Sequence, residues 1–163
     1  MLEEAVITLG DAHARDAAFA EFFGVEYPRV AGYCFRLLRD EEAAHEAAQE
    51  AFTRLYCRWV RTDDPRPYVF RIATNLVYRE WRRRSRPQPE VDAADAPDLV
   101  NELAVRAAVA ALPRRLREVV VLFYFAELRV GEIAVALDRP EGTVKAQLSE
   151  ARGLLAQRLG GTA

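Results

Sequence analysis

Arginines gather beside an amide and an aromatic side chain in the middle of the chain. Residues 82–86 read Arg-Arg-Arg-Ser-Arg and directly follow Trp81, while Asn75 and Arg79 stand one to two helical turns earlier. Guanidinium groups bind phosphates, an amide can hydrogen-bond to a base edge, and stacking of a base on an aromatic ring contributes about 1–3 kcal/mol. This combination favours contact with nucleic acid. A solvated helix end and, for Trp81, packing in the core are the alternatives that these residues leave open.

A second set of polar residues lies near the C-terminus, where apolar spacing predicts a short helix, a turn at residues 138–140 and a longer helix. A helix-turn-helix needs a small residue where its helices cross, here Ala134, and apolar residues that lock the pair together. The locking positions are Ile133, Leu137, Val144 and Leu148. Polar side chains would then face outward from the second helix into a DNA major groove. Helical hairpins without any DNA function show the same pattern, so the motif alone leaves both interpretations open.

The sequence contains no arrangement typical of an enzyme. His13 and His45 have no partners at the spacing of a metal site or a catalytic triad, and no glycine-rich phosphate loop occurs. We therefore expect no catalytic residue, no metal and no cofactor. Cys34 and Cys57 each stand in an apolar helical pattern, which predicts two buried thiols.

Charge is distributed unevenly along the chain, although the net charge is only −2. Residues 61–86 carry 8 basic and 3 acidic side chains, and residues 103–163 carry 9 and 6, whereas residues 87–102 carry none and 5. Residues 1–60 are acidic, with 6 basic and 11 acidic side chains. Two basic blocks indicate two separate contacts with an anionic partner. No apolar run approaches the roughly 20 residues of a membrane span, and the first residues are acidic, so we expect a cytoplasmic protein without a membrane partner.

The elements that position these residues are predicted to be helices almost throughout, because apolar residues recur at spacings of three and four. Pro28 predicts a kink or a restart in the first helical segment. Asp40 is a suitable N-cap for the second segment, which is expected to reach Trp59. In the C-terminal half, Asp98 and Pro113 each predict the start of a helix, the first of them running through Leu99, Leu103, Ala107 and Leu112.

Residues 87–97 are rich in proline, alanine and acidic side chains and too poor in large apolar residues to form a core. We interpret them as a flexible linker between two small helical domains, residues 17–86 and 98–163. Residues 1–16 form an N-terminal extension. Fully extended, the linker would span roughly 35–40 Å, which allows the two domains to bind separate sites.

Several motifs resemble extracytoplasmic-function sigma factors, the group 4 members of the sigma-70 family. Residues 44–52 (AHEAAQEAF) resemble region 2.2, and residues 68–75 leading into 81–84 resemble regions 2.3 and 2.4. Leu112-Pro113, Glu132-Ile133-Ala134 and Gly142-Thr143-Val144-Lys145, followed by Leu148 and Ala151-Arg152, resemble region 4. The similarity covers about residues 19–159 in the order expected for the family.

The resemblance implies an all-α protein that binds core RNA polymerase, recognises and melts promoters, and directs transcription initiation. It implies that the −10 element is bound by Asn75, Arg79, Trp81, Arg82, Arg83 and Arg84. For the −35 element it implies Arg139, Thr143, Lys145, Gln147 and Arg152, and for the polymerase clamp helices Glu46, Gln49, Glu50 and Phe52. Arg114, Arg115 and Arg117 would face the polymerase flap or DNA, with ordinary surface charge as the alternative. An inhibitory anti-sigma factor is a further partner that the family implies.

The chain departs from the family pattern at several of these positions. His45 and Glu46 stand where Glu and Asp are usual, Arg79 replaces a frequent Asp, and Gln147 and Glu150 occupy positions that arginine often holds. The last two weaken the expected contact with phosphates. An operator-binding helix-turn-helix regulator that acts without core polymerase, or a helical adaptor that binds only protein, would be the rival functions.

Overall fold

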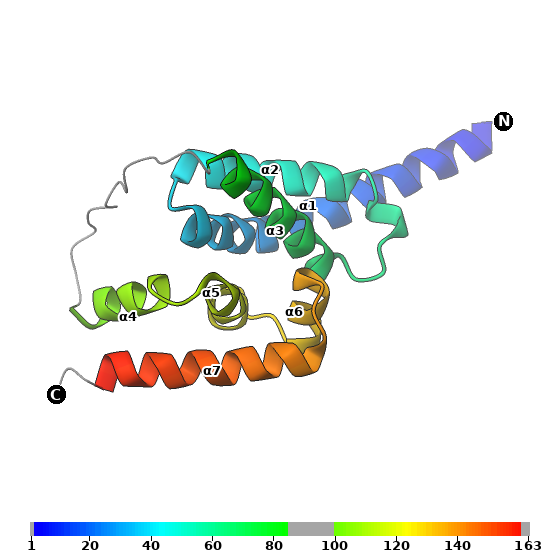
Figure 1. Ribbon diagram of the computed structural model, residues 1–163. Coiled ribbons are helices and arrows are strands. Elements are labelled where there is room, and N and C mark those ends of the chain that lie inside the picture. The colour runs from blue at the N-terminus through cyan, green and yellow to red at the C-terminus, as the bar shows by residue number, and fades with distance from the viewer. Residues whose placement is uncertain (1, 85–99, 161–163) are drawn as a thin grey trace.

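The computed structural model describes residues 2–84 and 100–160, and all regular structure in these two ranges is helical, which confirms the all-α prediction (Figure 1). The first range holds α1 (Leu2–Leu38), α2 (Glu41–Tyr56), the short 3-10 helix η1 (Trp59–Arg61) and α3 (Pro65–Arg83). The second range holds α4 (Val100–Ala110), α5 (Arg114–Val120), the π-helical turn η2 (Val121–Phe125), α6 (Val130–Leu137) and α7 (Glu141–Gly160). The predicted linker, residues 87–97, and the expected cap Asp98 lie outside the described residues.

Helix α1 runs without a break from Leu2 to Leu38 and contains Pro28 in its interior, so the restart, one of the two outcomes expected at this proline, does not occur. A proline in a helix removes one backbone hydrogen bond. Here the same helix packs on both sides of it, with Phe22 against the core before the proline and Val30 and Tyr33 buried after it. This continuous packing outweighs the single lost bond. The N-terminal end of α1 projects beyond the other helices (Figure 1).

Helix α2 begins as the sequence predicts and ends earlier. The carboxylate of Asp40 accepts a hydrogen bond from the backbone N–H of Ala43 at 3.0 Å, which satisfies one free donor of the first turn. The helix ends at Tyr56, and Trp59 belongs to η1. Cys57, directly after the helix, is exposed, so the prediction of two buried thiols holds only for Cys34.

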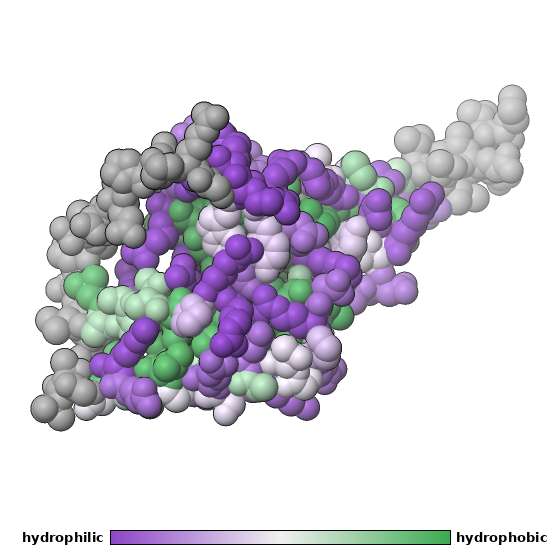
Figure 2. Space-filling model, viewed as in Figure 1, coloured by the Kyte–Doolittle hydropathy of each residue, from purple (hydrophilic) through white to green (hydrophobic). Residues whose placement is uncertain are grey.

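The C-terminal half contains the predicted helix-turn-helix. Helices α6 and α7 are joined at residues 138–140, where Asp138 adopts a left-handed conformation with φ 54°. Ile133 and Val144 are completely buried between the helices. Helix α4 ends at Ala110, before the expected Leu112, and it buries Ala108 and Val109 while Leu103 and Ala107 are exposed. Only one narrow side of α4 meets α5 and α7, and a patch of hydrophobic residues over α4 faces solvent (Figure 2).

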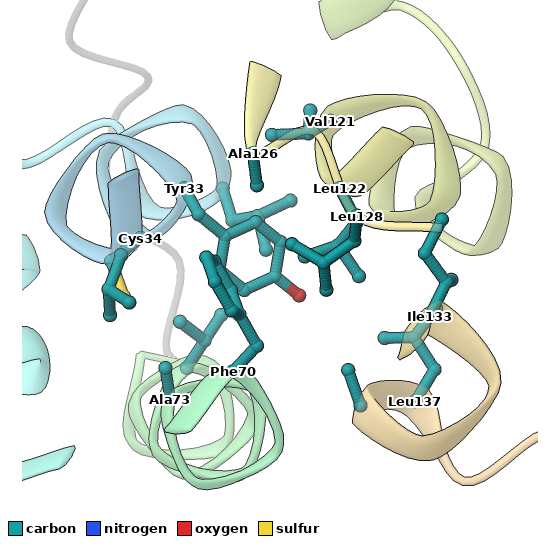
Figure 3. Close-up of a cluster of buried hydrophobic side chains, with 14 of the residues drawn as sticks. Tyr33, Cys34, Phe70, Ala73, Val121, Leu122, Ala126, Leu128, Ile133 and Leu137 are labelled. Atoms are coloured by element: carbon teal, nitrogen blue, oxygen red, sulfur yellow. The ribbon is translucent and has the colours of Figure 1, made fainter. Parts of the chain in front are cut away.

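The two halves of the chain pack against each other through one continuous core. Helix α3 lies against α6, and α1 contacts η2. Figure 3 shows Tyr33 and Phe70 of the first half beside Leu122, Leu128 and Ile133 of the second. All five side chains are at most 2% exposed. This placement, which the sequence left open, decides which faces of the site helices are accessible.

Candidate nucleic-acid interface

The outward face of α3 carries the residues expected to contact the −10 element. Asn75, Arg79 and Arg82 follow one another at helical spacings of four and three, and all three are exposed. The opposite side of the helix is apolar, and Ala73 and Val77 are completely buried. Burial of that side fixes the rotation of α3, so an amide and two guanidinium groups point to solvent in one row.

The three arginines at the end of α3 have different surroundings. Arg84 is about a quarter exposed and donates to Asp40 at 2.7 Å, Glu80 at 2.7 Å and the backbone carbonyl of Leu38 at 3.2 Å. Arg83 is largely exposed and forms a two-pronged contact with Glu80 at 2.8 and 2.9 Å, which is the main reason why the pKa of Glu80 falls to about 2. Arg82 is exposed. Arg84 therefore ties the end of α3 to the junction of α1 and α2, while the other two guanidinium groups face solvent.

Trp81 is partly buried, between the two outcomes that the sequence left open. Its ring stacks on Tyr78, with 5.7 Å between centroids and an interplanar angle of 22°. The guanidinium carbon of Arg114, from α5, lies 4.0 Å from the Trp81 centroid and 4.2 Å from the Tyr78 centroid. Such cation–π contacts stabilise by about 0.5–2 kcal/mol. A side chain of the second half thus covers the aromatic pair.

The helix-turn-helix presents only part of the residues expected at the −35 element. Thr143 and Lys145 are exposed in the first turns of α7. Arg139 is 19% exposed, forms an ion pair with the buried carboxylate of Glu118 and donates to Gln147 at 3.0 Å. Arg139 and Gln147 therefore hold the turn against α5.

Two further arginines of the second half have protein partners. Arg152 donates to the Tyr124 hydroxyl at 2.9 Å. Arg115 pairs with Glu150 at 2.8 and 2.9 Å. The outer part of α7 is thus linked to η2 and α5 by exposed polar contacts, which are weak and easily exchanged for a phosphate.

The face of α2 that would meet polymerase adjoins the row on α3. Glu46 and Gln49 are exposed, and Glu50 forms an ion pair with Arg79 at 3.0 Å. Phe52 is 2% exposed, and its ring centroid lies 4.9 Å from that of Phe23. The expectation that Phe52 contacts polymerase directly is therefore wrong, because its ring is buried in the core, whereas the polar members of the set lie at the surface.

Sequence reasoning missed two residues that shape this site. Glu118 is 1% exposed and pairs with both Arg139 and Arg114, the latter at 3.2 Å. Its signal was an acidic residue directly before the apolar residues Val119 and Val120 of α5, where a buried charge needs partners. Arg66, at the start of α3, contacts the second half, and nothing in the local sequence indicates this.

Among residues 2–84 and 100–160, no group of histidine, cysteine and acidic side chains could hold a metal ion. In the same part of the chain, no helix is both long enough and apolar enough to cross a membrane.

Each half of the chain matches a family model of known proteins. Residues 22–87 match the family model for sigma-70 region 2, and residues 102–155 match the model for sigma-70, region 4. The chain is 30% identical over 167 residues to the ECF RNA polymerase sigma factor SigW of Bacillus subtilis, covering 87% of this chain and 89% of that protein. It is 28% identical over 161 residues to the ECF RNA polymerase sigma factor RpoE of Cereibacter sphaeroides, covering 90% and 89%.

Two solved structures share the fold. The sigma factor RpoE in complex with the anti-sigma factor NepR from Bartonella quintana has a TM-score of 0.72 at 18% identity, covering 90% of this chain and 99% of that chain. CnrH in complex with the cytosolic domain of CnrY has a TM-score of 0.69 at 22% identity, covering 93% and 96%.

A helical domain that matches sigma-70 region 2, followed by a helix-turn-helix domain that matches sigma-70 region 4, defines a sigma-70 type protein. The chain belongs to the extracytoplasmic-function (ECF) RNA polymerase sigma factors. Its function is that of an alternative sigma factor in promoter-directed transcription initiation. Sigma factors are non-enzymatic regulators of transcription.

Proposed function

We propose that this sigma factor divides its work between the two domains first expected at residues 17–86 and 98–163, with α3 reading the −10 element and α7 the −35 element. The observation that carries this division is the exposed row of Asn75, Arg79 and Arg82 on α3. Its chemistry suits a single strand: guanidinium groups for phosphates and an amide for an extruded base. Arg83 can exchange its exposed contact with the carboxylate of Glu80 for a contact with phosphate.

At the −35 element, Thr143 and Lys145 are the residues that enter the major groove first, because they are exposed at the N-terminal end of α7. Lys145 contacts phosphate, since an ammonium group is a point charge without the geometry to select a base. Arg139 and Gln147 act mainly by fixing the turn. Arg152 can contact DNA only if it gives up its hydrogen bond to the Tyr124 hydroxyl.

The polymerase-binding face comprises Glu46, Gln49 and Glu50 on α2, facing the clamp helices, with Phe52 supporting it from the core. The contact between Glu50 and Arg79 couples this face to the −10 row. The exposed side of α4 is a suitable surface for the polymerase flap. An anti-sigma factor is the expected inhibitor, because the structural relative RpoE from Bartonella quintana was solved in complex with the anti-sigma factor NepR. The protein would act in the cytoplasm, where it meets polymerase.

The deciding experiment is transcription in vitro from a genomic fragment library with core polymerase and the full chain. We expect start sites that share two spaced sequence elements. The variant Asn75→Ala with Arg82→Ala and Arg83→Ala should lose these starts, because it removes the base contact and two phosphate contacts together.

The matched control is Arg58→Ala with Arg61→Ala, which removes two exposed arginines of the same domain away from the row on α3. It should retain the starts. Loss of activity in the control as well would refute the assignment of the row. Specific DNA binding that is tight without core polymerase, and no new start sites, would favour the operator-binding regulator instead.

A further inference from the structure

Gln147 lies on α7 at the edge of the helix face that is expected to meet DNA. It stands four residues after Thr143, so the two side chains share one face of the helix. Thr143 is exposed and Gln147 is partly exposed. The buried side of α7 is formed by Val144, Leu148 and Ala151. Gln147 can therefore reach the same major groove that Thr143 enters.

The oxygen of the Gln147 amide is already bound within the protein. One terminal nitrogen of Arg139 donates to the Oε1 atom of Gln147 at 3.0 Å and to the backbone carbonyl of Arg115, on α5, at 3.2 Å. A guanidinium group contains only donors, so the amide oxygen, and not the amide nitrogen, must face Arg139. The NH2 group of Gln147 is therefore the part of the amide that is left to contact a base.

Arg139 is itself held in place by a buried carboxylate. Its other terminal nitrogen forms an ion pair with Glu118, whose side chain is 1% exposed, while that of Arg139 is 19% exposed. The second oxygen of Glu118 is bound by Arg114 at 3.2 Å. Because a buried carboxylate that loses its partner is destabilising, the guanidinium group stays on Glu118 and keeps the amide of Gln147 from rotating. Glu118 and Arg139 thus act on Gln147 as positioning residues.

An amide whose oxygen is occupied selects bases differently from a free amide. A free glutamine binds adenine with both of its groups, since it donates to N7 and accepts from the N6 amino group. An NH2 group alone only donates. It meets two acceptors on guanine, O6 and N7, whereas adenine and cytosine each present an amino group that also donates. The arrangement around Gln147 therefore favours guanine.

We propose that Gln147 is a specificity-determining residue, which selects guanine through its NH2 group at one position of the −35 element because Arg139 and Glu118 hold its oxygen on the protein side. This inference rests on the proposed function of α7. It goes beyond that function by naming the base that is selected and the two residues that impose the choice.

The test is transcription in vitro by core polymerase and the full chain from a promoter library with a constant −10 element and a randomised −35 element. A barcode in each transcript identifies its promoter. For the parent chain we expect one −35 position at which guanine is preferred over adenine by about five- to tenfold. Gln147→Ala should remove the preference at that position and leave the other positions as they are.

Gln147→Glu is the decisive variant, because a carboxylate keeps the contact with Arg139 and presents an acceptor to the base in place of a donor. The preferred base at the same position should change from guanine to cytosine, whose amino group donates. Arg139→Ala frees the amide oxygen, so the ratio of adenine to guanine at this position should rise by about fivefold. A loss of stability alone would lower transcription without changing the preferred base.

Lys145→Ala is the matched control on the same helix. Loss of a phosphate contact should lower transcription from all −35 sequences alike and leave every base preference unchanged. An unchanged preference in Gln147→Glu, in a protein with the circular dichroism spectrum of the parent, would overturn the selection by Gln147, and so would a parent that prefers adenine there. Either result would leave the proposed function intact, whereas no promoter-directed transcription by the parent chain would refute both proposals.

Discussion

At the scale of single residues, the arginine run after Trp81 shows how neighbours of one type separate into different roles. The sequence predicts DNA contact for Arg82, Arg83 and Arg84 alike. Within residues 2–84 and 100–160, only Arg84 of the three donates to groups on another part of the domain, at Asp40 and Leu38. Its guanidinium group joins the end of α3 to the α1–α2 junction, which no local pattern reveals because the partners are more than 40 residues away in sequence.

We expect Arg84→Ala to lower the free energy of unfolding by about 1–3 kcal/mol, because it removes charge-assisted hydrogen bonds from a mostly buried side chain. Arg82→Ala should change it by no more than about 0.5 kcal/mol, since an exposed side chain is removed. Urea denaturation followed by circular dichroism measures both. Equal effects of the two substitutions would contradict the structural role of Arg84.

At the scale of elements, the sequence predicts those helices whose ends and faces are set locally. Asp40 marks the start of α2, and the locking residues of α6 and α7 follow from their spacing. The prediction is wrong where distant packing decides. Helix α1 continues through Pro28 because α2 and α3 cover it on both sides of that residue.

The ends of α1, α2 and α3 meet at a cluster of opposite charges that makes stability depend on pH. Arg83, then Arg84, lowers the pKa of Glu80 to about 2, and the backbone N–H of Ala43 lowers the pKa of Asp40. Both carboxylates therefore stabilise the fold at pH values above their ordinary pKa values of 4.5 and 3.8. That stabilisation is lost as the pH falls through the lowered pKa of each group, which is about 2 for Glu80.

Denaturation between about pH 5 and pH 2 should show a smaller loss of stability for Glu80→Gln than for the parent chain. The amide cannot lose a favourable charge on acidification. Glu42→Gln, which changes an exposed carboxylate of the neighbouring helix α2, is the control and should follow the parent. Parallel pH profiles for all three proteins would contradict this origin of the acid sensitivity.

At the scale of the whole molecule, the sequence predicts the division of the chain into a region 2 domain and a region 4 domain. It does not predict that the two domains pack against each other. Periodicity shows which side of a helix is apolar, but it does not show which other helix covers that side. Phe70 and Ile133 each fit a core within their own domain, and the structure brings both into one core. For the same reason the exposed row on α3 was predicted, while the contact of Arg114 with the neighbouring ring of Trp81 was not.

Because the two halves share one core, we expect this core to be exposed to solvent only rarely in the native protein. The reactivity of the two cysteines measures this exposure. Cys34 is completely buried, and burial raises the pKa of its thiol to about 12, so almost no reactive thiolate forms at neutral pH. Cys57 is exposed. A disulfide-exchange reagent at neutral pH should modify one thiol rapidly and the second only as the chain unfolds, with the second rate rising in parallel with added urea. The Cys57→Ser variant should lose the rapid phase alone, and rapid modification of both thiols in the native protein would show that the core is open.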